Sequence, residues 1–141
     1  MTTVAIIGAG LSGLIAARSL ADAGLSVVIF EKSRGTGGRM ATRRIEHEIS
    51  FDHGAQYFTV RDPEFRKRVD LWIEKGIVAA WPNTAAGQRL VVLKDRQLES
   101  ESGSLDRFVG VPAMNSVCKH LATGLDIRKQ TRVASVGRVE G

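Results

Sequence analysis

The feature that most constrains this chain is a glycine-rich turn directly after a short apolar run. Residues 4–7 are continuous, apolar and mostly β-branched, which predicts a buried strand. The turn occupies residues 8–13, and apolar residues then recur at helical spacing over residues 11–23. A second apolar run at residues 25–30 completes a strand–helix–strand unit of about 30 residues with parallel strands. The pattern predicts an α/β, Rossmann-like fold that binds a dinucleotide.

Each position of the glycine turn has a mechanical task in such a fold. Gly8 makes the tight turn out of the strand, and Gly10 has no side chain where the backbone must approach the pyrophosphate. Gly13 lets the helix approach the sheet. The helix that begins near Leu11 directs its free N–H groups and positive dipole end at the phosphates, and Ser12 adds a hydroxyl donor. We therefore expect a diphosphate at this turn.

An acidic residue and a second glycine loop follow the second predicted strand. Glu31 stands where a carboxylate accepts hydrogen bonds from ribose hydroxyls, and its charge disfavours a 2′-phosphate, so NADP is not expected. In a plain NAD domain the second strand usually leads into another crossover helix. Here it leads into RGTGGR, residues 34–39, where Gly37 and Gly38 allow close backbone approach and Arg39 can fork onto two phosphate oxygens. Arg34 is interpreted as a solvated charge. A diphosphate held from two sides favours FAD over NAD.

The rest of the chain mixes short strands and helices. Asp62-Pro63 predicts the cap and first turn of a helix that runs to residue 75, with Phe65, Val69, Trp72 and Ile73 on one face. Further elements are expected as a hairpin at 41–51, strands at 77–81, 89–94 and 127–136, and a helix at 113–122.

The order of these motifs resembles the flavin-containing amine oxidase superfamily, and within it is most similar to the renalase-like oxidoreductases. The resemblance is carried by the glycine turn at residues 8–13, called the fingerprint below, and by four further blocks. These blocks are EK at 31–32, GGRM at 37–40, DHGAQYF at 52–58 and VGVPAMN at 109–115, the last followed by HLA at 120–122.

The resemblance implies a set of cofactor contacts. Gly8, Gly10, Leu11, Ser12 and Gly13 would hold the diphosphate, Glu31 and Lys32 the adenosine ribose, Gly38, Arg39 and Met40 the phosphates, Gln56 and Tyr57 the ribityl–flavin portion, and the backbone of Val133 the adenine. A lone histidine before a glycine is more often structural, so His53 is not assigned as a base. No catalytic residue and no metal site are predicted.

Members of this superfamily are more than twice as long as these 141 residues. We therefore expect a fragment or truncated product that keeps the cofactor-anchoring part. Its expected organisation is a Rossmann-like core at 1–60, the start of a substrate-side segment at 61–108, and a return to the cofactor domain at 109–141.

Composition excludes some classes of protein. No apolar stretch reaches the roughly 18 residues that suggest a membrane span, and residues 1–3 lack the basic region of a signal peptide. The single cysteine, Cys118, cannot form an intramolecular disulfide, which agrees with a cytoplasmic location. The net charge is +5, but the basic residues are mostly dispersed and aromatic residues are only 6%, so a nucleic-acid partner is not expected.

The sequence thus favours an FAD-dependent oxidoreductase. The resemblance implies that it takes hydride from a small reduced donor, dihydro-isomers of NAD(P)H for the renalase-like group or amines for classical amine oxidases, and passes electrons to O2. Two alternatives stay open. One is a non-catalytic dinucleotide-binding or interaction module, since fold does not fix activity. The other is an NAD-dependent dehydrogenase, against which the second glycine loop argues.

Overall fold

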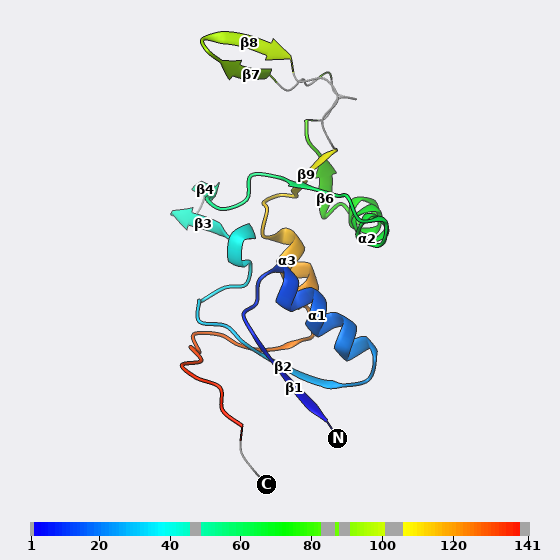
Figure 1. Ribbon diagram of the computed structural model, residues 1–141, viewed down its shortest axis with the longest axis vertical. Helices are drawn as coiled ribbons and strands as arrows, with labels where there is room; N and C mark the ends of the chain where they lie inside the picture. The colour runs from blue at the N-terminus through cyan, green and yellow to red at the C-terminus, as the bar shows by residue number, and fades with distance from the viewer. Residues whose placement is uncertain (1, 46–48, 83–86, 88–90, 101–105, 139–141) are drawn as a thin grey trace.

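The computed structural model describes residues 2–45, 49–82, 87, 91–100 and 106–138. Its base is a parallel sheet of three strands in the order β1-β2-β10 (Figure 1). The strands are β1 (Thr3–Ile7), β2 (Ser26–Phe30) and β10 (Asp126–Arg128), and helix α1 (Leu11–Asp22) connects the first two. The predicted Rossmann-like strand–helix–strand unit is confirmed. The third strand of the sheet comes from more than 90 residues further along the chain.

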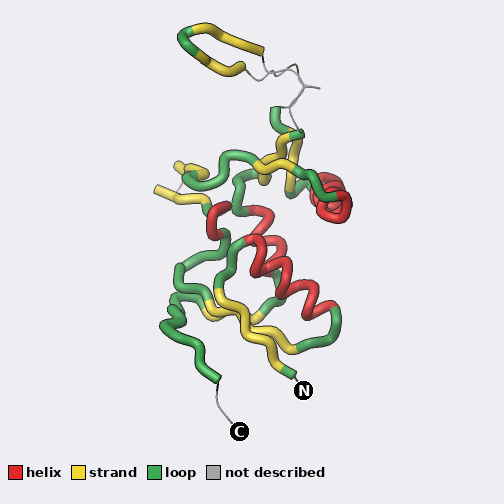
Figure 2. Tube along the Cα trace, in the orientation of Figure 1, coloured by secondary structure: helices red, strands yellow, loops and turns green. Residues whose placement is uncertain are grey.

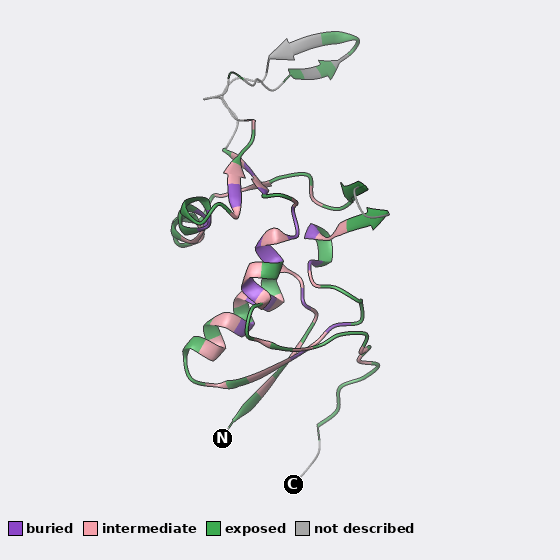
Figure 3. Cartoon of the chain, turned by 180° about the vertical axis from the view of Figure 1, so that it is seen from behind, coloured by how far each residue is buried: buried purple, intermediate pink, exposed green. Residues whose placement is uncertain are grey.

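The core lies on one face of this sheet, where α1 and α3 (Ser116–Ala122) lie side by side (Figures 1 and 3). Leu14 and Ala17 of α1 are fully buried against Ile29 of β2 and its neighbours. From α3 the buried side chains are Val117, Cys118 and Leu121. Helix α3 begins three residues later than predicted, because residues 111–115 form turns that lead into it.

The opposite face of the sheet is open in the described part of the chain. Strand β1 alternates between exposed and half-buried residues, and Ile7 is 60% exposed. The sequence prediction of a fully buried strand is therefore wrong for β1. The reason is that α1 and α3 both lie on the same side, so only alternate side chains reach the core.

A second, antiparallel sheet has the order β5-β9-β6 and is covered by α2 (Pro63–Glu74). Its strands are β5 (Phe58–Thr59), β6 (Val78–Ala80) and β9 (Arg107–Gly110). Tilted and edge-on ring contacts join Phe58, Phe65, Trp72 and Phe108 into one aromatic cluster. Strands β5 and β9 were not predicted, because runs of two and four residues give almost no alternation to read.

Helix α2 is the predicted helix, and its start is capped as expected. The carboxylate of Asp62 accepts a hydrogen bond of 2.7 Å from the N–H of Phe65. The predicted apolar face holds for Phe65, Val69 and Trp72, which all belong to the core or pack against it. The prediction is wrong for Ile73, which is 37% exposed because it lies at the edge of that face.

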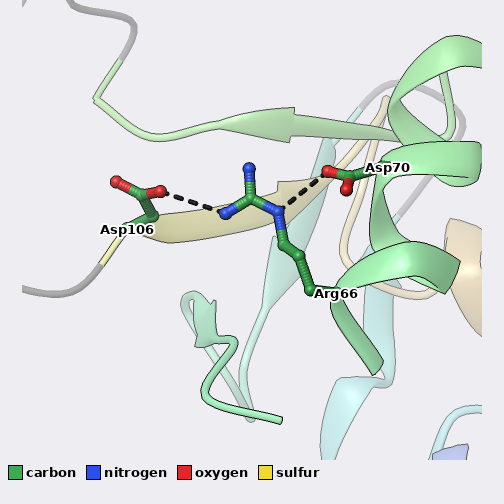
Figure 4. Close-up of polar contacts among 3 residues, drawn as sticks. All are labelled: Arg66, Asp70 and Asp106. Carbon is green, nitrogen blue, oxygen red and sulfur yellow. Dashed lines mark hydrogen bonds and ion pairs between the residues drawn. The ribbon is translucent and has the colours of Figure 1, made fainter. Parts of the chain in front are cut away.

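An exposed arginine also ties α2 to the second sheet. Arg66 contacts Asp70 one turn later in the helix at 2.8 Å, and Asp106 just before β9 at 3.1 Å (Figure 4). Its guanidinium also lies 5.3 Å from the ring centre of Phe108. These contacts fix the helix over the strand that it covers.

Two hairpins complete the fold (Figure 2). The predicted hairpin is confirmed as β3 (Thr42–Ile45) and β4 (Ile49–Asp52), paired antiparallel. The second hairpin pairs β7 (Val91–Lys94) with β8 (Gln97–Ser100); only its first strand was predicted. Strand β6 confirms the strand predicted at 77–81, within a residue or two of its ends.

The strand predicted at 127–136 is correct only at its start. Strand β10 ends at Arg128, and Gln130 has a positive φ of 55°, which turns the chain out of the sheet. The following residues up to 138 form no regular element. None of the helices in the described residues has the length and apolar character that crossing a membrane requires.

Candidate nucleotide-binding site

The two glycine segments lie in direct contact. The N–H of Gly37 donates to the carbonyl oxygen of Ala9 at 2.9 Å, and Gly10 and Gly37 form an isolated parallel bridge. A Cβ placed on Gly38 would lie 3.1 Å from the Cα of Gly10, tighter than side chains normally allow. Segments almost 30 residues apart in the sequence therefore meet at one place, beside the start of α1.

The fingerprint turn has the geometry that its glycines suggest. Gly8 has a φ of +98°, which favours glycine, and its N–H donates to the carbonyl oxygen of Phe30 at 2.8 Å. A Cβ on Gly13 would overlap the carbonyl oxygen of Gly8. The fold itself therefore requires glycine at both positions.

Gly10 differs from these two because the fold does not require it. Its φ of −81° and ψ of 177° suit any residue. An added Cβ would meet only the Cα of Gly38, at an ordinary contact distance of 3.8 Å. A reason for glycine here must come from outside the described chain, such as a ligand that approaches the backbone closely.

The N-terminus of α1 offers unused hydrogen-bond donors. Within the described residues, the N–H groups of Leu11, Ser12 and Gly13 have no acceptor. Gly10 supplies no capping side chain, and the first turn contains no acidic residue. Free donors at the positive end of a helix dipole form a favourable place for an anion.

Glu31 connects the two glycine segments through its carboxylate. The side chain is 7% exposed. One carboxylate oxygen accepts from the N–H of Ala9 at 2.7 Å and the other from the N–H of Ser33 at 2.7 Å. Burial by itself raises the pKa of Glu31, but the hydrogen bonds from Ala9 and Ser33 and the charge of Lys32 together outweigh burial, so the net pKa lies below its ordinary value. Glu31 is therefore ionised at neutral pH.

A third segment reaches the same place from the far end of the chain. The N–H of Thr131 donates to the carbonyl oxygen of Glu31 at 2.9 Å, and the N–H of Gln130 donates to that of Ser33 at 3.1 Å. Val133 is half-buried two residues further on, in the irregular segment rather than in the expected strand. Lys32 is exposed beside Glu31.

The glycine–arginine loop, residues 34–39, is approached closely by Gly54, a residue that was not singled out from the sequence. A Cβ on Gly54 would overlap the carbonyl oxygen of Arg39, which accepts from the N–H of Ala55 at 2.7 Å. The position of Gly54 in the DHGAQYF block, which carries part of the family resemblance, was the available signal. The Arg39 side chain is exposed and has no hydrogen bond or ion pair with the described residues. Met40 is buried in the core, so its side chain is not free to contact a ligand.

Gln56 is exposed and directly follows Ala55, which contacts Arg39. Tyr57 is also exposed, but its ring contacts Trp81 and Arg107. The Tyr57 ring stacks on Trp81 with centres 5.8 Å apart and planes 18° apart. The guanidinium of Arg107 lies 4.7 Å from the centre of the same ring. Neither Trp81 nor Arg107 was singled out from the sequence, because the contact depends on the pairing of β5, β9 and β6.

A cavity of about 310 Å³ touches the glycine–arginine loop at Thr36 and is otherwise lined by residues between Lys119 of α3 and Lys129, which directly follows β10. Since no fingerprint residue lines it, this cavity is not the phosphate position argued above. Among the described residues, no three His, Cys, Asp or Glu side chains are grouped as metal ligands.

Several known proteins are similar to the N-terminal half of this chain. Residues 6–70 match the family model described as "NAD(P)-binding Rossmann-like domain". The chain is 40% identical over 77 residues to an L-glutamate oxidase precursor of Streptomyces diastatochromogenes, covering 51% of this chain and 12% of that protein. It is 37% identical over 67 residues to protoporphyrinogen oxidase 2 of Arabidopsis thaliana, covering 48% and 13%. An L-amino acid oxidase of Bothrops pictus is 43% identical over 72 residues, covering 51% and 14%.

Among solved structures, wild-type putrescine oxidase bound to putrescine is similar at 28% identity, with a TM-score of 0.46, over 72% of this chain and 22% of that one. The chain spans only 12 to 14% of the length of the curated relatives named above. The curated relatives named above are oxidases, in agreement with the broader resemblance to the flavin-containing amine oxidase superfamily. The narrower resemblance to the renalase-like group stays a prediction.

Proposed function

We propose that this chain is the cofactor-anchoring part of an FAD-dependent oxidoreductase. The observation that carries the proposal is the contact between Gly10 and the glycine–arginine loop, beside three unused N–H donors of α1. These groups can hold a diphosphate from two sides, together with Arg39, whose side chain has no hydrogen bond or ion pair among the described residues. The homologous oxidases are FAD-dependent, which supports FAD as the dinucleotide.

The proposed contacts follow FAD from its diphosphate to its ribose and flavin portions. The α1 N-terminus, with Gly10 and Ser12, would hold the diphosphate. The buried carboxylate of Glu31 keeps lone pairs for a ribose hydroxyl beyond its two internal hydrogen bonds. Further contacts are proposed for the remaining predicted residues, namely Lys32, Gly38, Gln56, Tyr57 and the backbone of Met40 and Val133.

When bound, FAD would supply the acceptor for a hydride from a small reduced donor and pass the electrons to dioxygen. The chain's own task is to bind and orient it. For the donor we propose dihydro-isomers of NAD(P)H, on the renalase-like resemblance, with amines or amino acids as the second class, on the similarity to L-amino acid oxidases. We also keep the division at residues 60 and 108, and a cytoplasmic location, as proposals.

An alternative is an NAD-binding module without flavin, which the description of the matching family model favours. Purifying the chain and recording its visible spectrum separates the two. A yellow protein that releases FAD on denaturation supports the flavin proposal. A colourless protein that binds NAD saturably, and FAD no better, contradicts it.

Gly10→Ala tests the diphosphate position. The apo protein has room for the added Cβ, so circular dichroism and thermal unfolding should be unchanged, while FAD affinity falls at least tenfold because the methyl group occupies the approach to the backbone. Gly35→Ala is the matched control, since a Cβ at Gly35 meets nothing within 4 Å. The position is wrong if both variants bind FAD as tightly as wild type in a fluorescence titration.

Arg39→Ala tests whether the glycine–arginine loop binds the diphosphate of FAD. A lost charge-assisted contact is worth about 1.5–3 kcal/mol, or roughly ten- to a hundredfold in the dissociation constant of FAD. Arg34→Ala, in the same loop, should leave that constant within twofold. Equal weakening by the two substitutions would mean that only general positive charge matters, and no weakening by Arg39→Ala would remove the argument for flavin over nicotinamide.

A further inference from the structure

A second pocket lies away from the glycine segments, between the three helices. It has a volume of about 360 Å³, within the lower range for small-molecule sites. Side chains of α1, α2 and α3 line it, together with Lys75 and Thr123, which directly follow α2 and α3. No residue of the fingerprint or of the glycine–arginine loop is among them.

The pocket combines an apolar wall with basic groups. Trp72 and Leu121 are buried and Leu71 is exposed, so together they offer an apolar surface that is partly open to a ligand. The remaining lining residues are polar or basic: Arg18, Arg68, Lys75, His120 and Thr123. No Asp or Glu side chain lines it.

Arg18 is held rigidly at this pocket. One terminal nitrogen of its guanidinium donates to the carbonyl oxygen of Leu121 at 2.8 Å and also to that of Thr123, at the C-terminal end of α3. These carbonyls use one end of the guanidinium, and its other N–H groups have no acceptor within the part of the chain that the structure describes. A charged group that is already oriented loses little entropy when it binds an anion.

Arg68 and Lys75 are not neutralised by acidic residues. Within the described residues neither forms an ion pair, whereas their helix neighbours Arg66 and Lys67 are paired with acidic side chains. The positive charge also acts on His120. Burial lowers the pKa of His120, and the positive charges of Lys75 and Arg18 lower it further. The pocket therefore carries positive charge from Arg68 and Lys75 that no ion pair among the described residues neutralises.

We propose that this pocket binds a small phosphate monoester that carries an apolar group. Arg18 and Arg68 suit the fork-like recognition of phosphate oxygens, and Lys75 adds a third positive charge opposite the dianion. Trp72 and Leu71 would contact the apolar group. The site is separate from the proposed FAD site and does not depend on it.

Calorimetric titration with phenyl phosphate tests the proposal, with the protein saturated with FAD and, separately, without FAD. We expect saturable binding with similar affinity in both cases. Inorganic phosphate, which lacks the apolar group, and phenol, which lacks the charge, should each bind at least tenfold more weakly. Absence of saturable binding, or displacement of phenyl phosphate by FAD, would overturn the proposal.

Arg68→Gln and Lys75→Gln should each weaken phenyl phosphate binding at least fivefold. Lys67→Gln is the matched control, because it removes the same charge from the same helix but does not line the pocket. It should bind as wild type does. Equal weakening by all three variants would show attraction to the basic surface in general and would contradict a defined site.

Discussion

Gly10 and Gly13 stand three residues apart and are glycine for different reasons. A side chain on Gly13 would overlap the preceding turn, so this glycine serves the fold. A side chain on Gly10 would meet only ordinary contacts, so the chain alone gives no reason for glycine there. This difference is what makes Gly10→Ala a test of binding rather than of folding.

Glu31 holds the backbone of the site together without a ligand. Its ionised carboxylate accepts two backbone N–H groups, and glutamine can accept only one of them with its oxygen. We expect Glu31→Gln to lower the free energy of unfolding by about 1–3 kcal/mol at pH 7, because a buried N–H loses its acceptor. Urea unfolding of both proteins measures the difference.

The stability difference between wild type and Glu31→Gln should depend on pH. The folded-state pKa of Glu31 is lowered from the ordinary value of 4.5, so its stabilisation is complete above that value and is lost as the pH falls through the lower, folded pKa. The stability difference between wild type and Glu31→Gln should therefore shrink below about pH 4.5. Glu64→Gln, at an exposed ion pair, should show a difference below about 0.5 kcal/mol throughout. A Glu31 difference that is constant with pH would contradict this account.

At the scale of elements, local chemistry and tertiary contacts together determine where α2 begins and which strands it covers. Asp62 caps the first turn and Pro63 follows at the first helical position, both local signals. The helix is then fixed over the second sheet by Phe65 and Trp72 in the aromatic cluster and by Arg66 at its surface. The local signals set where the helix begins, and the aromatic contacts set what it covers.

We expect Asp62→Ala to lower the free energy of unfolding by about 1 kcal/mol, because the N–H of Phe65 loses its acceptor. Asp62→Ser keeps an oxygen at the same place and should retain most of that stability. Chemical denaturation of the two variants beside wild type makes the comparison. If serine and alanine cost the same, the cap hydrogen bond is not the stabilising feature.

At the scale of the whole molecule, the candidate site is built from three segments that are remote in sequence. The fingerprint, the loop after Glu31 and the segment after β10 meet through backbone hydrogen bonds of Ala9, Gly37 and Thr131. Strand β10 completes the parallel sheet beside β2 and delivers the third segment. Strands β5, β6 and β9 form a separate antiparallel sheet, which α2 covers.

The sequence by itself determined the strand–helix–strand unit, the two glycine loops and the start of α2. Each depends on short-range properties, namely apolar periodicity, positive φ at glycine and the capping of a free N–H. Only the tertiary structure decided that β1 is open on one face, that the strand from Asp126 ends at Arg128, and that Tyr57 stacks on Trp81. These features depend on which distant surfaces bury one another, and no local pattern of residues encodes that choice.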